Sequence, residues 1–478
     1  MRKVLIAICL FCLVFFSFQF PARAENDSQI ELLERFMNES MEKYGIPGAS
    51  LAIIQNGELM FQESWGEQRK GTPVTKDTLF TIGSISKPLT SLAIMRLVDD
   101  KMIELDQEID RYLPAFHYDR NGFDKKITIR HLLTHTSGIS SYDGLDVADR
   151  NLRGENAINV AVQNLNNVHL NYEPGEVHQY SAANYLLLGR IIENVTNQTF
   201  SEFMDDEIFS EIGMSRTVSD FESAKELGYQ PGYQSWFGKP VKSRGIFDDS
   251  GAPYGYMVST TGDMSKFIKI LLDGDKILSK DSFNTYTSPH YHRKEDMYYG
   301  LGWRISTEVD NSYYFHGGET PDSRAELFIN PQQDYGFILL TNKNNFSEVL
   351  STVRMREGIK MIVEEGKSPK VQQLNHHMQW STFIVTLFLL LLSSWNLYRL
   401  IKKTKIKSKV WIFIGVLSIL LSIIMIPLII YLFNSPWNTI NLYAPAIAIL
   451  IKVLVGILAT NGVLLLFVVY FKKSSVGD

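Results

Sequence analysis

The chain has 478 residues and a net charge of −5, with acidic and basic side chains interspersed along its length. It is too long for one ordinary hydrophobic core, so more than one folding unit is expected. The absence of a basic stripe or a block of like charges argues against a nucleic-acid partner. Both cysteines lie within residues 1–24, so the rest of the chain has neither a disulfide framework nor a cysteine nucleophile.

Residues 1–24 have the pattern of a secretory signal peptide. A short basic start precedes an apolar run over residues 4–20, and the sequence A-R-A at 22–24 offers small residues for cleavage after Ala24. The alternative is an uncleaved signal anchor. Either form predicts that the chain is exported.

Residues 25–365 are predicted to form an extracytoplasmic α/β (α+β) domain. Apolar periodicity over 30–44 predicts a helix. Residues 50–55 and 58–64 predict a hairpin, because Asn56-Gly57 suits a type I′ turn. Towards the other end the pattern predicts three more strands and then a helix, at 312–318, 324–330, 335–342 and 346–365. We expect an antiparallel sheet built from both ends of the domain, flanked by helices, with a helical insertion between.

The C-terminal region predicts three transmembrane helices within residues 380–473, after a juxtamembrane linker at 366–379. The apolar runs cover about 380–399, 410–433 and 444–471, and each meets the roughly 20 residues that a span requires. Basic residues crowd the first loop and begin the tail, whereas the second loop has no charge. The positive-inside rule therefore places the 25–365 domain outside the cell membrane and the C-terminus in the cytoplasm.

Two polar residues interrupt the third apolar run. Lys452 lies near its start, where the side chain can snorkel to the outer interface. Asn461 lies deeper and is predicted to bond a neighbouring helix. These structural roles account for both residues, so neither one indicates a functional site.

Ser84 and Lys87 carry the first chemical motif, at the start of an apolar helix. Residues three apart share one helix face, so the lysine can reach the serine hydroxyl. A serine needs a base to become a nucleophile, and a lysine can serve if burial lowers its pKa. Ser40 and Lys43 have the same spacing within an amphipathic helix, so the spacing alone proves nothing. The alternative role for Ser84 is that of a helix N-cap.

The segment Gly83–Pro88 resembles the nucleophile motif of the class C β-lactamase / D-alanyl-D-alanine carboxypeptidase family of serine hydrolases. Further segments resemble that family in order and spacing, at 127–139, 180–189, 259–267 and 316–318. The resemblance implies a fold like that of β-lactamases and penicillin-binding proteins. It also implies an acyl-enzyme mechanism that needs no cofactor and no metal.

The resemblance implies roles for two residues besides the Ser-Lys pair. Tyr180 matches a tyrosine that relays protons to the nucleophile and leaving group, as a phenolate or together with Lys87. The alternative is a core tyrosine. The backbone N–H groups of Ser84 and Glu319 are expected to form the oxyanion hole.

Substrate-binding residues are expected in two of the matching segments. Ser181 and Asn184 follow the tyrosine. Gly317 and Gly318 are expected to leave room for substrate beside the backbone. His316 binds a substrate carboxylate or walls the pocket, and the sequence does not separate these roles.

The chain also departs from the family pattern. Ala182 stands where the family has an Asn that holds the substrate's amide side chain, which argues against efficient β-lactam hydrolysis. His131 and His135 are expected to stabilise the 127–139 segment, because no third ligand at useful spacing supports a metal site.

Together these features predict a membrane-anchored serine hydrolase that acts outside the cell on a small peptide, amide or ester. A peptidase or amidase on D-amino-acid-containing peptides comes first, as a carboxypeptidase, D-aminopeptidase or prodrug-maturing peptidase. An esterase or weak β-lactamase is the second possibility, and a non-catalytic penicillin-binding or immunity protein is the third. Three C-terminal spans after this domain resemble the colibactin-type prodrug-activating peptidases, although Thr81 stands where that enzyme has Glu. The sequence does not predict the physiological substrate or the oligomeric state.

Overall fold

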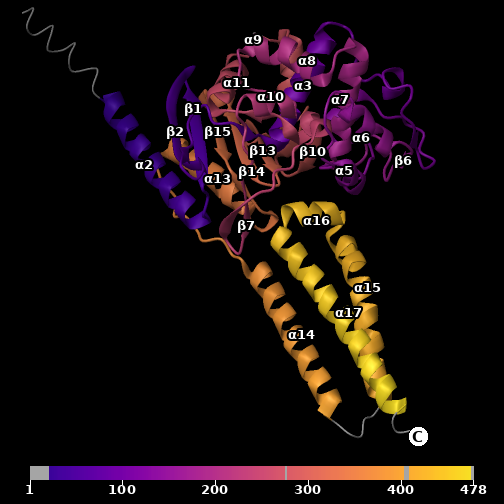
Figure 1. Ribbon diagram of the computed structural model, residues 1–478. Coiled ribbons are helices and arrows are strands. Elements are labelled where there is room, and N and C mark those ends of the chain that lie inside the picture. Colours follow the sequence, from indigo (N-terminus) through magenta and orange to yellow (C-terminus); the bar gives the residue numbers. More distant parts are fainter. Residues whose placement is uncertain (1–20, 275–276, 310, 403–407, 475–478) are drawn as a thin grey trace, which may run out of the picture.

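The computed structural model describes residues 21–274, 277–309, 311–402 and 408–474. The predicted signal peptide lies largely outside these residues. Figure 1 shows a folded domain that stands at one end of a group of long helices. The N-terminal and C-terminal segments of the domain meet in one central sheet.

The central sheet is antiparallel and runs in the order β10-β11-β12-β13-β14-β15-β1-β2-β3. Strand β1 from the start of the domain pairs with β15 from its end, which confirms the predicted arrangement. Asn56 and Gly57 have φ of 52° and 72°, as the predicted type I′ hairpin between β1 and β2 requires. The strands are β1 (Gly48–Gln55), β2 (Glu58–Arg69), β3 (Thr72–Pro73), β10 (Tyr291–Lys294), β11 (Met297–Tyr299), β12 (Arg304–Ser306), β13 (Tyr313–Thr320), β14 (Ser323–Asn330) and β15 (Tyr335–Thr341).

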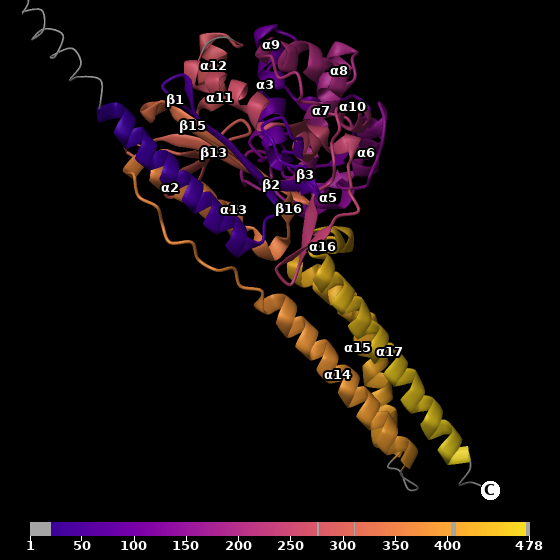
Figure 2. The same ribbon diagram turned by 60° about the vertical axis from the view of Figure 1, so that its left-hand side comes forward.

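Each face of the sheet has its own core because successive strand side chains point to opposite faces. Leu51 and Ile53 pack with helices α2 (Pro21–Tyr44) and α13 (Leu350–Glu365), which lie side by side in Figure 2. Ala52 and Ile54 face the other way, into a larger core with α3 (Ser86–Asp99) and α11 (Thr261–Asp273).

The segment between the early and late strands is mainly helical, as predicted. Two short strands, β4 (Phe80–Thr81) and β9 (Val258–Ser259), pair beside the start of α3. Strands β5 (Tyr118–Asp119) and β6 (Val168–His169) form a second short pair. The helices are α4 (Ile129–Leu133), α5 (Ser141–Val147), α6 (Ala157–Leu165), α7 (Ala182–Thr196), α8 (Phe200–Met204), α9 (Ser210–Ile212), α10 (Phe221–Glu226) and α12 (Lys280–Thr287).

Three C-terminal helices are long and apolar enough to cross a membrane: α14 (His377–Lys402), α15 (Ser408–Phe433) and α17 (Pro445–Ser474). Asn461 Nδ2 donates to Ser418 Oγ at 3.2 Å, which confirms the predicted bond to a neighbouring helix. Lys452 Nζ donates to Asn441 Oδ1 at 2.8 Å, near the outer end of α17. A fourth, short helix, α16 (Trp437–Tyr443), forms where the sequence suggested only a loop.

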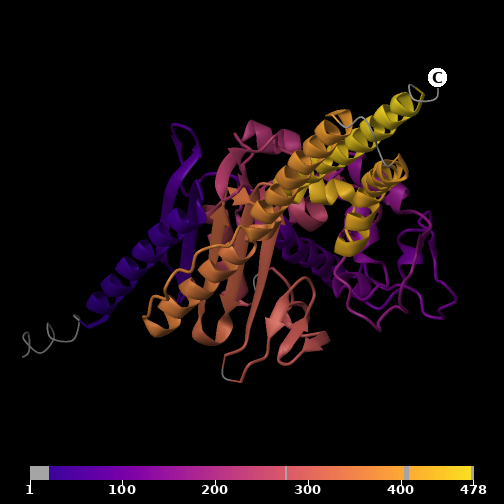
Figure 3. The same cartoon turned by 90° about the horizontal axis from the view of Figure 1, so that it is seen from below.

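A hairpin of the domain reaches down to the C-terminal helices. It consists of β7 (Tyr233–Trp236) and β8 (Lys239–Lys242), and β7 also pairs with β16 (Lys343–Asn344). At its tip the ring of Phe237 lies 4.7 Å from that of Trp380 in α14. Gln234 Nε2 donates to the Leu442 carbonyl of α16 at 2.8 Å. These contacts fix the helices against the underside of the domain, the side that Figure 3 shows.

Candidate active site

Ser84 lies in a turn of 3₁₀-helix, Gly83–Ile85, between β4 and α3. Its Oγ is 3.0 Å from the Nζ of Lys87 in the first turn of α3. Ile82 and Ile85 occupy the N-cap positions of the turn and of α3, so Ser84 does not act as a cap. The structure therefore brings the predicted nucleophile and base into hydrogen-bonding contact.

The second Ser-x-x-Lys sequence forms no such pair. Lys43 Nζ binds Glu39 at 2.5 Å and the Val371 carbonyl at 3.0 Å. Ser40 is buried in α2, far from the turn at Ser84 in sequence and packed on the opposite face of the sheet. The same spacing thus has a purely structural use here.

Lys87 is almost fully enclosed, with 2% of its surface exposed. Its Nζ donates to the Tyr254 carbonyl at 2.6 Å and lies 4.8 Å from the centroid of the Tyr180 ring. Burial, helped by the positive charge of Arg304, holds the pKa of Lys87 well below its usual range. A lowered pKa favours the neutral amine, which is the form that accepts a proton.

Tyr180 lines the same cavity as Ser84, and its hydroxyl interacts with the Ser84 side chain. Burial raises the pKa of Tyr180 to about 12, and the Arg304 guanidinium only partly opposes this effect. The phenol is therefore protonated near neutral pH. Of the two forms that the sequence left open, the structure favours the phenol over the phenolate.

His135 packs against the ring of Tyr180. Its ring lies 4.3 Å from the Tyr180 ring, and its Nδ1 accepts from Asn184 Nδ2 at 2.9 Å and from the Ser181 backbone N–H at 3.2 Å. Ser181 Oγ donates to the Ser140 carbonyl. Ser181 and Asn184 are buried by these bonds and do not line the cavity at Ser84. The two side chains were predicted to contact substrate, but in the structure they hold the segment that carries Tyr180 in place.

His131 has a capping role, in agreement with the sequence. Its backbone N–H donates to Thr128 Oγ1, and its Nδ1 accepts from the Thr128 backbone N–H, at 3.3 and 3.2 Å. This reciprocal pair starts α4.

Strand β13 presents its free edge to the turn at Ser84. Strand β12 pairs with β13 only as far as Phe315, so the stretch that includes Glu319 has no partner strand on that side within the described residues. Gly83 has a φ of 54°, and a Cβ there would lie 2.1 Å from the Glu319 backbone nitrogen. A Cβ at Gly318 would lie 1.9 Å from the Ile82 carbonyl oxygen. The two glycines thus let the turn and the strand approach closely, as an oxyanion hole built from both requires.

Neither of the other two residues of the His-Gly-Gly motif lines the cavity. His316 is fully buried, with Nδ1 2.7 Å from the Gly317 carbonyl and Nε2 3.4 Å from the Tyr299 hydroxyl. A Cβ at Gly317 would lie 3.2 Å from the Glu326 carboxylate. The predicted roles in substrate binding do not fit this geometry, because Gly317 makes room for Glu326, Gly318 for the turn, and His316 packs inside.

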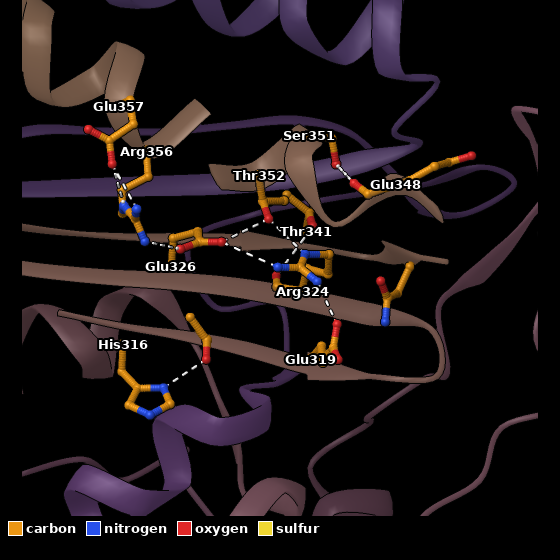
Figure 4. Close-up of polar contacts among 12 residues, drawn as sticks. His316, Glu319, Arg324, Glu326, Thr341, Glu348, Ser351, Thr352, Arg356 and Glu357 are labelled. Carbon is orange, nitrogen blue, oxygen red and sulfur yellow. Dashed lines mark hydrogen bonds and ion pairs between the residues drawn. The ribbon is translucent and has the colours of Figure 1, made fainter. Parts of the chain in front are cut away.

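A buried charge network fixes the far side of this strand, as Figure 4 shows. Arg324 donates to Glu319 at 2.6 Å and to Thr352 at 2.7 Å, and it pairs with Glu326 at 3.5 Å. Arg356 of α13 donates to the same Glu326 at 3.1 Å. The buried charges of Arg324, Glu326 and Arg356 thus partly balance one another, and Arg324 holds the side chain of Glu319, which is 40% exposed.

The turn, the strand edge and α7 surround a cavity of about 470 Å³. Ser84, Lys87, Tyr180 and Glu319 all line it. Ala182, at the position of the family's Asn, lines it too, so no amide side chain stands there. The remaining lining residues come partly from the C-terminal helices, namely Met378, Ile429, Phe433, Ser435, Thr439, Ile440, Tyr443, Ala444 and Ile447.

Several residues of the site could not be recognised from the sequence alone. Asp149 lines the cavity and accepts from the Tyr256 hydroxyl at 2.5 Å. Burial raises its pKa to about 6. Tyr254 contributes a carbonyl to Lys87 from a π-helical turn at Ala252–Tyr256. These groups belong to no short motif, since each reaches the site through tertiary packing.

The fold and the grouping of these side chains are those of the β-lactamase and penicillin-binding-protein-like serine hydrolase family. A family model described as Beta-lactamase matches residues 33–357, and the chain belongs to this family.

Similar proteins are found in bacteria and archaea. Protein flp of Staphylococcus aureus (strain MRSA252) is 29% identical over 445 residues, which cover 88% of this chain and 87% of that protein. Penicillin-binding protein 4 of Amycolatopsis lactamdurans is 30% identical over 251 residues, 50% of this chain and 65% of that protein.

Two solved structures share the fold. The octameric penicillin-binding protein homologue from Pyrococcus abyssi aligns with a TM-score of 0.62 and 24% identity, covering 73% of this chain and 80% of that one. EstCE1, described as a hydrolase with promiscuous acyltransferase activity, aligns with a TM-score of 0.59 and 20% identity, covering 66% of this chain and 94% of that one.

Proposed function

We propose that this protein is a membrane-anchored, extracytoplasmic serine hydrolase that acts through a seryl acyl-enzyme. The observation that carries the proposal is the 3.0 Å contact between Ser84 Oγ and the amine of the buried Lys87, inside a cavity of a β-lactamase-family domain. The first substrate class is a peptide or amide that contains a D-amino acid.

The mechanism follows from the protonation states. Neutral Lys87 accepts the Ser84 proton as Oγ attacks the substrate carbonyl carbon. The backbone N–H groups of Ser84 and Glu319 stabilise the oxyanion that forms. Protonated Tyr180 lines the same cavity, donates a proton to the leaving group and regains one from Lys87. Water then attacks the acyl-enzyme and gives a proton to Lys87. The bond between Ser84 Oγ and the acyl carbon breaks, Lys87 returns the proton to Ser84 Oγ, and the acid is released.

An esterase is the second candidate, and Ala182 favours it. The cavity wall at this position offers a methyl group rather than an amide, so it has no hydrogen bond to give to an amide side chain of the substrate. An ester is also chemically easier to cleave. Efficient β-lactam hydrolysis is disfavoured for the same reason. A colibactin-type prodrug peptidase remains a subclass of the first candidate, supported by the three C-terminal helices. A non-catalytic penicillin-binding or immunity protein is disfavoured by the intact contacts of Ser84, Lys87 and Tyr180.

The proposed topology places residues 1–24 as a signal peptide, 25–365 outside the cell, 366–379 as a linker and 380–473 in the cell membrane. Figure 1 supports it: the end of α14, with Lys402, and the end of α17 lie at the extremity of the bundle that is remote from the domain. Basic residues near those ends fit the cytoplasmic face.

The test is covalent labelling of the full-length protein in membranes with a fluorophosphonate probe and a labelled penicillin. We expect wild type to be labelled and Ser84→Ala to lose all labelling. Ser40→Ala is the matched control, because it alters the second Ser-x-x-Lys sequence, and it should label normally. Undiminished labelling of Ser84→Ala would overturn the assignment. Turnover of D-amino-acid amides, D-Ala-D-Ala peptides, nitrophenyl esters and nitrocefin would then rank the substrate classes.

A further inference from the structure

The cavity at Ser84 has two unlike sides. The catalytic domain supplies the reactive groups: Ser84, Lys87, Tyr180 and the edge of β13 at Glu319. The opposite side comes from the C-terminal end of α15, from α16 and from the start of α17, and its side chains are mainly aliphatic or aromatic. The apolar and aromatic ones are Ile429, Phe433, Ile440, Tyr443, Ala444 and Ile447, and the polar ones are Ser435 and Thr439. We call this second side the helix wall.

The helix wall is docked on the domain by specific polar contacts. Asp149 accepts from the Tyr443 hydroxyl of α16, and the Asp149 carbonyl accepts from Asn438 Nδ2 at 3.3 Å. Gln234 of the β7–β8 hairpin donates to the Leu442 carbonyl at 2.8 Å. A helix of only seven residues has little stability of its own, so these contacts are what keep α16 beside the catalytic groups.

The position of the helix wall indicates that its ligand approaches from the membrane. It lies where α15 ends and α17 begins, which is the level of the membrane surface if these helices span the bilayer. Met378 at the start of α14 lines the same cavity. An apolar surface at this level would lie between the bilayer that the three helices are expected to span and the nucleophile Ser84.

We propose that the substrate is an amphiphile, an ester or amide whose hydrocarbon chain lies against the helix wall while its carbonyl reaches Ser84. This inference rests on the proposed hydrolase function and specifies its substrate class. A small polar peptide would leave the wall in contact with water, whereas a chain that buries it gains about 0.8 kcal/mol per methylene, roughly a fourfold gain in binding. In the reaction the C–O or C–N bond breaks, water supplies OH to the acyl carbon, and its remaining proton goes to the leaving group.

The test measures kcat/KM for a series of esters and amides with chains of 2 to 12 carbons. One set carries the chain on the acyl side and the other on the leaving group. The full-length protein is used in nanodiscs, and each compound is kept below its micelle-forming concentration. We expect kcat/KM to rise at least tenfold, in one set or both, before it levels off. A chain-length-independent kcat/KM in both sets would overturn the inference.

A pair of substitutions on α17 separates the helix wall from the lipid-facing surface. Ile447→Trp fills part of the cavity, since Ile447 lines it and is only 8% exposed. Ile449→Trp puts the same side chain two residues on, where Ile449 is 42% exposed and faces away from the cavity. We expect Ile447→Trp to lower the long-chain to short-chain ratio of kcat/KM at least tenfold and Ile449→Trp to leave it within twofold. Equal ratios in both variants and wild type would overturn the inference.

Labelling of Ser84 by the fluorophosphonate distinguishes a failure of the amphiphile inference from a failure of the proposed hydrolase function. If the wild-type protein labels and cleaves the short compounds without chain-length dependence, the hydrolase function stands and the amphiphile inference falls. If the wild-type protein labels no Ser84 and cleaves nothing, the proposed function falls first. Retained labelling of Ile447→Trp would also show that this variant is folded, so that a lost preference for long chains reports on the wall.

Discussion

Different interactions hold the two sides of the cavity together. The catalytic side is built around Ser84 and Lys87, which lie three residues apart and are joined by a hydrogen bond in a buried setting. The helix wall is formed by residues from position 429 onward, and apolar packing with a few hydrogen bonds holds it in place. The first arrangement fixes which bond breaks. The second selects which molecule brings that bond to Ser84.

This difference explains why membership of the family supports a type of reaction but does not identify the substrate. The family model covers residues 33–357, which include the catalytic side and none of α14 to α17. The helix wall lies outside that match, so two relatives with the same chemistry can differ in the molecules that they accept. The catalytic side and the wall should therefore respond separately to mutation.

Loss of Lys87 should have the largest effect and should remain confined to the catalytic side. Lys87→Met keeps the apolar part of the side chain but removes the base, so we expect kcat/KM to fall about 10³-fold, or ~4 kcal/mol in the transition state. Initial hydrolysis rates on a nitrophenyl ester measure this. Lys43→Met is the matched control and should retain activity. A tenfold loss or less in Lys87→Met would show that another group is the base.

The network behind β13 gives the next effect, on stability. Arg324→Met leaves the buried Glu326 with Arg356 as an ionic partner and with the Thr352 hydroxyl as a neutral donor, and breaking a buried pair in this way costs roughly 3–5 kcal/mol. Thermal unfolding in detergent should show a markedly lower Tm. The double variant Arg324→Met/Glu326→Gln removes the orphaned charge, so part of the loss should be recovered. Equal stability of single and double variants would contradict a charge-balance role.

The sheet and the central catalytic residues were predictable because their signals are local. The alternation over 50–55 and the Asn56-Gly57 turn predict the hairpin, and the Ser84 motif with its helix predicts the nucleophile and base. Tyr180 required the family resemblance, since a lone tyrosine carries no spacing signal. All three side chains meet at the cavity in the structure.

The rest depended on tertiary contacts that no local pattern encodes. The sequence placed Asn184 and His316 at the substrate, but burial and hydrogen bonds to other side chains and to backbone hold them within the fold. The linker between the last two spans lacks charge and helical periodicity, so α16 and its bond to Asp149 were not anticipated. Such contacts depend on how the membrane helices approach the domain, which pattern and propensity leave open.

The smallest effect should come from Asp149, which should influence both overall stability and the position of the helix wall. Burial raises the pKa of Asp149 to about 6, above the value of 3.8 for an unperturbed Asp. The folded state therefore binds this proton more tightly, so the stability that it contributes is complete below about pH 4 and is lost as the pH rises through about 6. The two-unit difference corresponds to at most about 3 kcal/mol. Asp149→Asn cannot ionise and should flatten this part of the pH dependence of Tm.

The matched control is Asp205→Asn, because burial also raises the pKa of Asp205 to about 6, yet Asp205 lies in the π-helical turn Asp205–Phe209 and does not line the cavity. Both variants should flatten the stability profile between pH 4 and 7. Only Asp149→Asn should also change how the long-chain to short-chain ratio of kcat/KM varies over that range, because only Asp149 bonds Tyr443 of α16. If the two variants altered that ratio equally, ionisation of Asp149 would act through overall stability, and the wall would not depend on this contact for its position.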